Sequence, residues 1–211
     1  MYRHVCSRAT HDMLSSPAGL PLLPTHDILL GISIHLGLVF RLYGDVQPQA
    51  AKEFLAAADG FIRRNIYYSF RHTFFHRVVA DVSVHGGDLT ARDGTGGTTV
   101  AGAPYKPDGK VRLRHDQPFL LSLDAPRRGK YTSRFLVTLK PAPELDDDHV
   151  VIGELVSGHE FLREMSKVPV DEFFKPQVNI TIVDCGIKTF SSKPKPDPAA
   201  SADKPAAESK A

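Results

Sequence analysis

The chain has 211 residues, of which 42% are hydrophobic, and a formal net charge of +2 at pH 7. This length is enough for one domain with a buried core and additional tails. The small net charge argues against binding to nucleic acid or to an anionic membrane. No uninterrupted apolar run is long enough to span a bilayer, so we expect no membrane association.

The two cysteines, Cys6 and Cys185, lie far apart in the sequence. Because Cys6 falls in a probable tail, we expect no structural disulfide and a reducing compartment, the cytoplasm. The ten histidines are scattered, and none belongs to a Cys/His cluster with metal-ligand spacing, so we predict no metal site.

The N-terminal part predicts an extension followed by strands and a helix. Residues 1–24 carry several prolines and serines and are predicted to be irregular; because they contain few acids, a mitochondrial presequence is the alternative. Two apolar runs within residues 27–43 predict a pair of strands. Residues 47–58 predict a helix that starts near Pro48 and buries Ala51, Phe54, Leu55 and Ala58.

Residues 59–73 interleave arginines with aromatic residues. Such a pattern can grip RNA by stacking, but we expect a solvated loop whose rings cover the core. A protein-contact surface is the intermediate alternative, because Tyr and Arg are favoured at interfaces.

Residues 74–97 combine a predicted β-strand with a glycine-rich loop. Phe and Val dominate the first half, Gly86-Gly87 ends the strand, and three further glycines permit a tight turn. Downstream, strands are predicted at 111–115, 119–123, 135–139, 149–155 and 178–185, a helix at 160–168 and an acidic loop at 141–148. The Lys-, Pro-, Ala- and Ser-rich residues 188–211 predict a disordered tail.

Three strings resemble the signature of the cyclophilin family of peptidyl-prolyl cis-trans isomerases. They are Phe75-His76-Arg77-Val78-Val79, His85-Gly86-Gly87-Asp88-Leu89-Thr90 and Gly94-Thr95-Gly96-Gly97, in the order and at the spacing of the family. The resemblance covers roughly residues 28–186 and implies a cyclophilin-like domain over 25–187. The implied fold is mainly β, a closed eight-stranded antiparallel β-barrel capped by two α-helices.

The resemblance also implies an activity, the isomerisation of X-Pro bonds in proteins without a cofactor. It assigns the catalytic role to Arg77, whose guanidinium can donate a hydrogen bond to the proline nitrogen of the twisted amide. A rim arginine that pairs with an acid is the alternative for this residue. The peptide-binding positions that the resemblance implies are Val82, Ser83, His85, Ala125, Arg134, Leu136, Leu145 and His149.

Several of these positions depart from the family pattern. Val82 and Leu136 stand where the family has phenylalanine, and Glu144 stands where it has a tryptophan that lines the cyclosporin-binding edge. Arg134 replaces a glutamine, which adds a second cation that costs energy unless an acid such as Asp124 or Glu144 neutralises it. We therefore expect weakened isomerase activity and weak or no cyclosporin binding. The alternative is a non-catalytic subunit that binds proteins within a larger assembly.

Overall fold

The computed structural model of the chain describes residues 27–33, 36–109, 111–125 and 129–188. The predicted extension at residues 1–24, and the predicted tail beyond Lys188, lie outside the described residues. The elements are β1 (Asp27–Ser33), β2 (Leu36–Leu42), α1 (Pro48–Asp59), β3 (Phe61–Arg63), β4 (Ile66–Tyr68), β5 (Arg77–Val79), β6 (Ser83–Gly86), β7 (Leu120–Leu123), β8 (Phe135–Thr138), η1 (Pro143–Leu145, a 3-10 helix), β9 (Val150–Ser157), α2 (His159–Ser166) and β10 (Asp184–Lys188).

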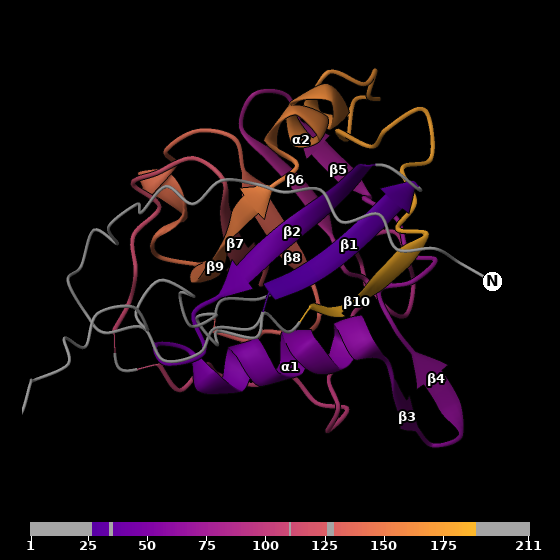
Figure 1. Cartoon of the computed structure of the whole chain (residues 1–211), viewed down its shortest axis with the longest axis vertical. Coiled ribbons are helices and arrows are strands. Elements are labelled where there is room, and N and C mark those ends of the chain that lie inside the picture. The colour runs from indigo at the N-terminus through magenta and orange to yellow at the C-terminus, as the bar shows by residue number, and fades with distance from the viewer. Residues whose placement is uncertain (1–26, 34–35, 110, 126–128, 189–211) are drawn as a thin grey trace, which may run out of the picture.

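Most of the strands form one large antiparallel sheet. Its order is β10-β1-β2-β9-β7-β8-β6-β5, and β3 pairs with β4 in a separate hairpin. The helix α1 packs next to β10 and β1, whereas α2 packs next to β2, β5 and β6 at the other end of the sheet (Figure 1). The prediction of a mainly β domain with a large antiparallel sheet and two α-helices is therefore confirmed.

The two outer strands of this sheet, β10 and β5, do not pair with each other in the described residues. The segments before them are joined instead by backbone hydrogen bonds, from His72 N to Ile182 O (2.6 Å), from Phe75 N to Ile180 O (2.9 Å) and from Ile182 N to Thr73 O (2.9 Å). The predicted strand at 178–185 is thus wrong for residues 178–183, because their bonds form this irregular junction and the strand begins only at Asp184.

The strand predicted between Phe74 and Gly86 is in fact two short antiparallel strands. A turn separates β5 from β6, in which Val82 N donates to Val79 O (3.0 Å) and Asp81 takes a positive φ of 57°. Aspartate tolerates this left-handed conformation better than most residues. The turn folds β6 back against β5, so that Arg77 and His85 become neighbours across the ladder.

The predicted strand at residues 111–115 is also wrong, because this segment forms no ladder. Its polar groups bond to the loop around η1 instead. His115 N donates to Asp146 Oδ1 (2.7 Å), and Ala142 N donates to His115 O (2.8 Å). An alternating pattern predicts a strand only where a neighbouring strand is available to pair with it.

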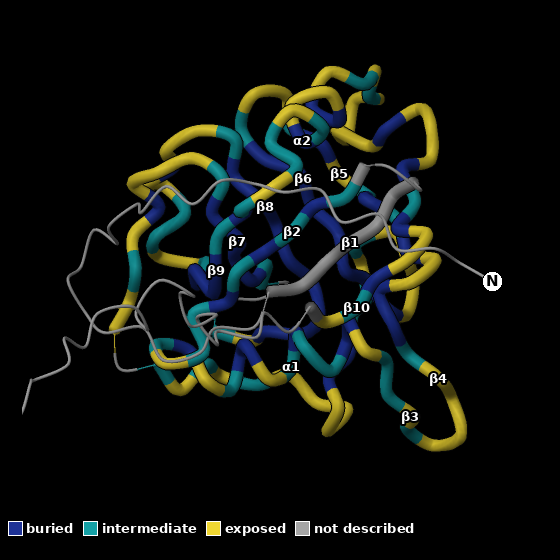
Figure 2. The backbone as a smooth tube through the Cα atoms, viewed as in Figure 1, coloured by how far each residue is buried: buried dark blue, intermediate teal, exposed yellow. Residues whose placement is uncertain are grey.

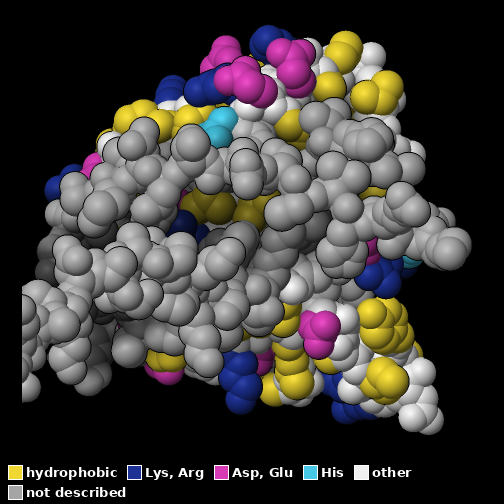
Figure 3. Space-filling view, viewed as in Figure 1, with side chains coloured by type: hydrophobic (Ala, Val, Ile, Leu, Met, Phe, Trp, Pro, Cys, Tyr) yellow, Lys and Arg dark blue, Asp and Glu magenta, His cyan; other side chains and the backbone are white. Residues whose placement is uncertain are grey.

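The predicted solvated loop at 59–73 contains the hairpin of β3 and β4. Arg64 and Asn65 form its turn with φ values of 49° and 63°, the left-handed pair that a two-residue hairpin favours. Ile62, Ile66 and Tyr67 are exposed on the hairpin, which projects from the body of the molecule (Figures 1 and 3).

The helix α1 begins at Pro48, as predicted, and its buried face consists of Ala50, Ala51, Phe54, Ala57 and Ala58. This face covers one end of the core (Figure 2). None of the helices in the described part of the chain is both long and apolar enough to cross a lipid bilayer.

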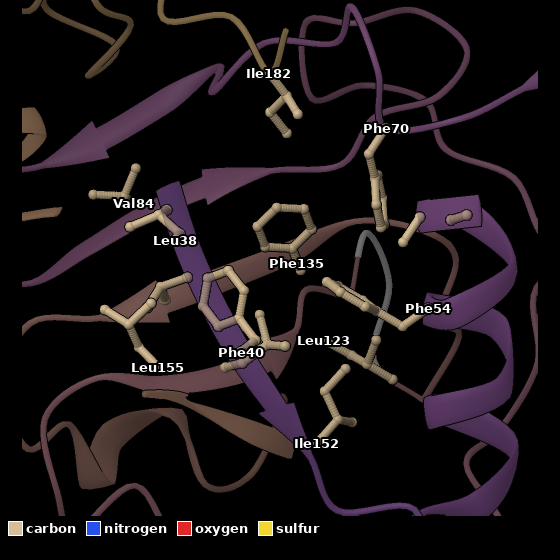
Figure 4. Packing of buried hydrophobic residues seen from close by; sticks show 14 of the residues in the cluster. Leu38, Phe40, Phe54, Phe70, Val84, Leu123, Phe135, Ile152, Leu155 and Ile182 are labelled. Carbon is tan, nitrogen blue, oxygen red and sulfur yellow. The ribbon is translucent and has the colours of Figure 1, made fainter. Parts of the chain in front are cut away.

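The core is organised around Phe135 at the start of β8 (Figure 4). The ring is fully buried, and its centroid lies 5.3 Å from that of Phe54, 5.3 Å from that of Phe70 and 6.0 Å from that of Phe75, all in edge-on geometry. Such contacts add about 0.5–1.5 kcal/mol each to the burial of the rings.

Replacement of Phe135 by alanine should therefore lower the free energy of unfolding by about 3–5 kcal/mol, because it leaves a cavity between three rings. Urea denaturation measures this change. The matched control is Ile62→Ala on the exposed hairpin, which should change the free energy by less than about 0.5 kcal/mol. A loss below about 1 kcal/mol for the Phe135 variant would show that the ring is not central to the core.

Candidate functional site

The glycine-rich loop that follows β6 is held by one carboxylate. Asp88 is fully buried, and its oxygens accept hydrogen bonds from the backbone N–H groups of Thr90, Ala91 and Gly94 (3.0 Å each) and Gly96 (2.9 Å). Burial by itself raises the pKa of Asp88, but these N–H donors outweigh it and lower the pKa to about 2. The loop is therefore fixed by an anion that stays charged at neutral pH.

Gly94 needs to be glycine for two reasons. Its φ of 92° lies in the region that side-chain-bearing residues rarely adopt, and a Cβ would collide with the ring of His76. The carbonyl of Gly94 accepts a hydrogen bond from the guanidinium of Arg134 on the strand side. The loop thus forms one wall of an open cleft.

The cleft has a volume of about 880 Å³ and is lined by residues from the glycine-rich loop, from β5 and β6, and from the loops after β7 and α2. Among the predicted site residues, those that line it are Arg77, Val82, Ser83, His85, Ala125, Arg134, Leu145 and His149. Further lining residues that the sequence did not single out as site residues are His76, Asp93, Asp124, Asp171, Phe173 and Lys175.

Leu136 is not among the lining residues. Its side chain is fully buried, although its position in β8 is opposite His85 in the ladder and opposite Ser122 of β7. Leu136 therefore belongs to the buried interior of the domain rather than to the lining of the cleft.

Arg77 lies on β5 with an exposed side chain that lines the cleft. The carbon at the centre of its guanidinium is 5.3 Å from the centroid of the Phe174 ring, a cation–π distance. Among the described residues, no carboxylate forms an ion pair with Arg77. Its N–H groups are therefore available to a ligand in the cleft.

The floor of the cleft is an ionic cluster around Asp124. Arg134 Nη2 lies 3.2 Å from Asp124 Oδ2, His149 Nε2 lies 3.4 Å from Asp124 Oδ1, and His85 Nδ1 lies 3.7 Å from Asp124 Oδ2. All four side chains are largely buried. Asp124 thus supplies the neutralising acid that the sequence predicted for Arg134, whereas Glu144 is exposed on η1.

Burial and this cluster set the protonation states of the floor. Burial alone raises the pKa of Asp124, but the contacts with His149 and His85 and the charge of Arg134 outweigh it and hold the pKa far below its usual range. Burial lowers the pKa of His85 despite the opposing effect of Asp124. At neutral pH the floor therefore holds an ionised Asp124 and a neutral His85, whose Nε2 is 2.9 Å from Ser83 Oγ.

A second polar cluster has the residue types of a Ser-His-Asp hydrolase but not the access that a hydrolase needs. His115 Nε2 lies 2.6 Å from Ser122 Oγ, and His115 Nδ1 lies 2.8 Å from Asp146 Oδ1. Ser122 and His115 are both fully buried, so no substrate can reach the hydroxyl. The cluster instead anchors the η1 loop, which carries Leu145 into the cleft, to β7.

No group of His, Cys, Asp and Glu suited to a metal ion occurs in the described part of the chain. The predicted free Cys185 is buried and donates from Sγ to Ala58 O at 3.1 Å, which fits a structural role. The sequence analysis named Asp124 only as one of two acids that could neutralise Arg134, although a charge that directly follows the buried strand β7 is also a signal for a site residue. Nothing in the sequence marked residues 171–175 as part of the site, apart from two adjacent phenylalanines.

Comparisons with known proteins identify the family. A family model described as cyclophilin type peptidyl-prolyl cis-trans isomerase/CLD matches residues 30–187. The chain is 36% identical over 166 residues to peptidyl-prolyl cis-trans isomerase D of Kluyveromyces lactis. The matched region covers 76% of this chain and 44% of that protein. It is 35% identical over 153 residues to peptidyl-prolyl cis-trans isomerase cyp11 of Rhizopus delemar, and the matched region covers 71% of this chain and 45% of that protein.

A third relative is the human NK-tumor recognition protein, which is 34% identical over 163 residues that cover 74% of this chain and 11% of that protein. The chain thus spans less than half the length of these relatives. The matching region contains all the cleft residues described above, from His76 to Lys175. The chain belongs to the cyclophilin-type peptidyl-prolyl cis-trans isomerase family.

Proposed function

We propose that the chain catalyses the cis-trans isomerisation of X-Pro bonds with reduced activity, and that Arg77 is its catalytic residue. The observation that supports this most directly is the exposed guanidinium of Arg77, which lines an open cleft of about 880 Å³. An arginine whose role is structural would be expected to pair with a carboxylate, and none pairs with Arg77 in the described residues.

The chemistry requires no covalent step. Amide resonance creates a barrier of about 18–20 kcal/mol, and the spontaneous exchange of an X-Pro bond takes tens of seconds or longer. When the amide twists, its nitrogen gains a lone pair that can accept a hydrogen bond. A guanidinium is charged at all relevant pH values, so Arg77 stabilises this state by donation without a proton transfer.

The reduced activity follows from the composition of the cleft. Val82 offers a small aliphatic surface where the family pattern has a ring, and Leu136 replaces a second ring beneath the floor. The ring missing at position 82 removes apolar contact area from the surface that faces a bound proline, whereas the change at Leu136 acts beneath that surface. Because Glu144 stands in place of the indole at the cleft edge, we also propose that cyclosporin binds weakly.

The alternative function is a protein-binding subunit without catalysis. The ionic cluster of Asp124, Arg134, His85 and His149 favours it, because a charged floor is a poor surface for an apolar proline ring. In this alternative the chain binds proteins or serves as a scaffold within a larger assembly, and Arg77 does not accelerate the exchange of X-Pro bonds.

We further infer that the domain extends over residues 25–187 and that its sheet closes into a barrel. Support for closure comes from the backbone hydrogen bonds between residues 72–75 and 180–182, which link the segments before β5 and β10. Closure would hold β5, and with it Arg77, at a fixed place on the cleft rim.

Replacement of Arg77 by alanine should reduce the catalysed exchange of Ala-Pro and Phe-Pro peptides by about 10²-fold, the loss typical for one preorganised donor. Exchange NMR measures this rate. Lys52→Ala on the exposed face of α1 removes the same charge far from the cleft and should leave the rate unchanged. Equal line broadening with the wild type and the Arg77 variant would favour the non-catalytic alternative.

Replacement of Val82 by phenylalanine should tighten the binding of a Phe-Pro peptide about fivefold, because the added ring faces the open cleft. Titration followed by NMR measures the dissociation constant. Val183→Phe provides the control, since Val183 is exposed but does not line the cleft. If both variants bind as the wild type does, the proline ring does not contact position 82.

The pH dependence of stability should reveal the protonation of His76, a half-buried histidine that lines the cleft. Burial and the neighbouring His85 lower the pKa of His76 to about 4. Among the smaller effects, Asp124 and Asp88 raise this pKa and Arg134 lowers it. Below pH 6.5 the unfolded chain therefore binds protons that the folded chain does not. The free energy of unfolding should fall as the pH drops from 6.5 towards 4, by on the order of 2–3 kcal/mol for this group.

Urea denaturation at several pH values tests this dependence. His76→Gln should flatten the slope between pH 6.5 and 4, whereas His72→Gln, which changes an exposed ring, should retain it. A slope that is the same in all three proteins would mean that His76 is protonated equally in the folded and unfolded states.

A further inference from the structure

The segment from Asp171 to Lys175, here called the 171–175 turn, forms one rim of the cleft. Asp171, Phe173 and Lys175 line the cleft together with Arg77. Phe173 has 76% of its surface exposed and Phe174 has 42%, so two adjacent aromatic rings lie in solvent at the site. Exposed rings at the edge of a cleft are typical of a contact surface for a ligand.

The 171–175 turn is firmly built. Asp171 Oδ1 accepts hydrogen bonds from Phe173 N and Lys175 N, both at 2.9 Å, and Asp171 N donates to Lys175 O at 2.9 Å. Phe174 O accepts a hydrogen bond from Val78 N at 2.8 Å, which fixes the turn to β5 beside Arg77. The Phe173 ring is therefore presented by a rigid backbone.

The backbone conformation of this turn costs stability, and its aromatic side chains add little to the core. Phe174 has a φ of 63°, a conformation that glycine adopts freely and that is strained for a phenylalanine. The Phe173 ring contributes little to folding, because it remains exposed. Strain of this kind persists where the surrounding structure enforces it, and it is concentrated at ligand-binding sites.

We propose that the 171–175 turn is a specificity-determining surface, on which Phe173 packs against an aromatic or large apolar side chain next to the proline of a bound peptide. The proposal rests on the proposed function, because it requires a proline peptide in the cleft. In this arrangement the turn supplies on one side of Arg77 an aromatic surface, whereas Val82 supplies only an aliphatic one within the cleft.

The distances indicate that the peptide residue in contact with Phe173 is the one directly next to the proline. The Arg77 guanidinium is 5.3 Å from the centroid of the Phe174 ring, so a ligand atom bound to Arg77 lies close to the turn. An extended peptide advances about 3.3–3.6 Å per residue, so a side chain one residue from the bound amide reaches this rim. An aromatic or large apolar side chain there covers the ring of Phe173, whereas an alanine is too short to cover it.

Three otherwise identical peptides test this proposal: one with alanine on both sides of the proline, one with phenylalanine before it and one with phenylalanine after it. NMR titration gives their dissociation constants. The wild type should bind one of the phenylalanine peptides about fivefold more tightly than the alanine peptide. Phe173→Ala should abolish this preference and Phe173→Trp should retain it. Ile62→Ala, which changes an exposed apolar residue on the β3–β4 hairpin, should leave it unchanged.

The outcomes separate this proposal from the function on which it rests. If the wild type binds the peptides but shows no preference, or if Phe173→Ala keeps the preference, the specificity surface is refuted and the proposed function stands. If the wild type binds none of the peptides and does not accelerate their exchange, both are refuted. Denaturation of each variant confirms that the changes do not arise from unfolding, since Phe173 lies outside the core.

Discussion

The register of β8 is the constraint on which the cleft depends. Side chains of a strand alternate between the two faces of a sheet, so the burial of Phe135 among three rings fixes the side on which its neighbours lie. Arg134 is thereby directed away from the aromatic core, to a position where it is 8% exposed. A guanidinium that is so deeply buried requires an anion beside it.

The pairing of β7 with β8 brings that anion next to the guanidinium. Leu123 of β7 is paired with Phe135, and Asp124 N donates to Arg134 O at 3.0 Å just beyond this pair. The backbone thus places Asp124 and Arg134 side by side, within reach of an ion pair. Arg134 then bonds to Gly94 O as well, so that one residue joins the end of β7 to the glycine-rich loop.

Within this frame the two arginines of the cleft have different electrostatic environments. Arg134 is neutralised and held beneath the surface, whereas Arg77 on β5 is exposed and contacts the Phe174 ring. A paired, buried cation has little remaining attraction for a ligand, and an exposed one retains its hydrogen-bond donors. This difference supports the assignment of the chemistry to Arg77 and of a structural role to Arg134.

Much of the fold could be predicted from the sequence, because its signals are local. The helix starting at Pro48 and the buried strand that became β7 follow from residue types and spacing, and most of the predicted site residues do line one cleft. The errors have tertiary causes. Residues 111–115 alternate as a strand does, but their bonds go to the η1 loop, and residues 178–183 join 72–75 without forming a regular ladder.

The resemblance named eight residues that line one cleft, but the contacts between these residues and the other lining residues depend on the tertiary structure. The sequence indicated that Arg134 needs an acid, yet it could not indicate that His85 and His149 share the same carboxylate. Leu136, which the resemblance also assigned to peptide binding, is fully buried and is not among the residues that line the cleft. The 171–175 turn reaches the cleft through a hydrogen bond to Val78 that no sequence motif encodes.

The Asp124–Arg134 pair makes these two positions unequal in their tolerance of substitution. A neutral residue at 124 would leave the buried Arg134 guanidinium without a carboxylate, at a cost of about 3–5 kcal/mol. A neutral residue at 134 would leave Asp124 with His149 and His85 as partners, so it would cost less. The domain therefore tolerates the loss of the arginine better than the loss of the aspartate.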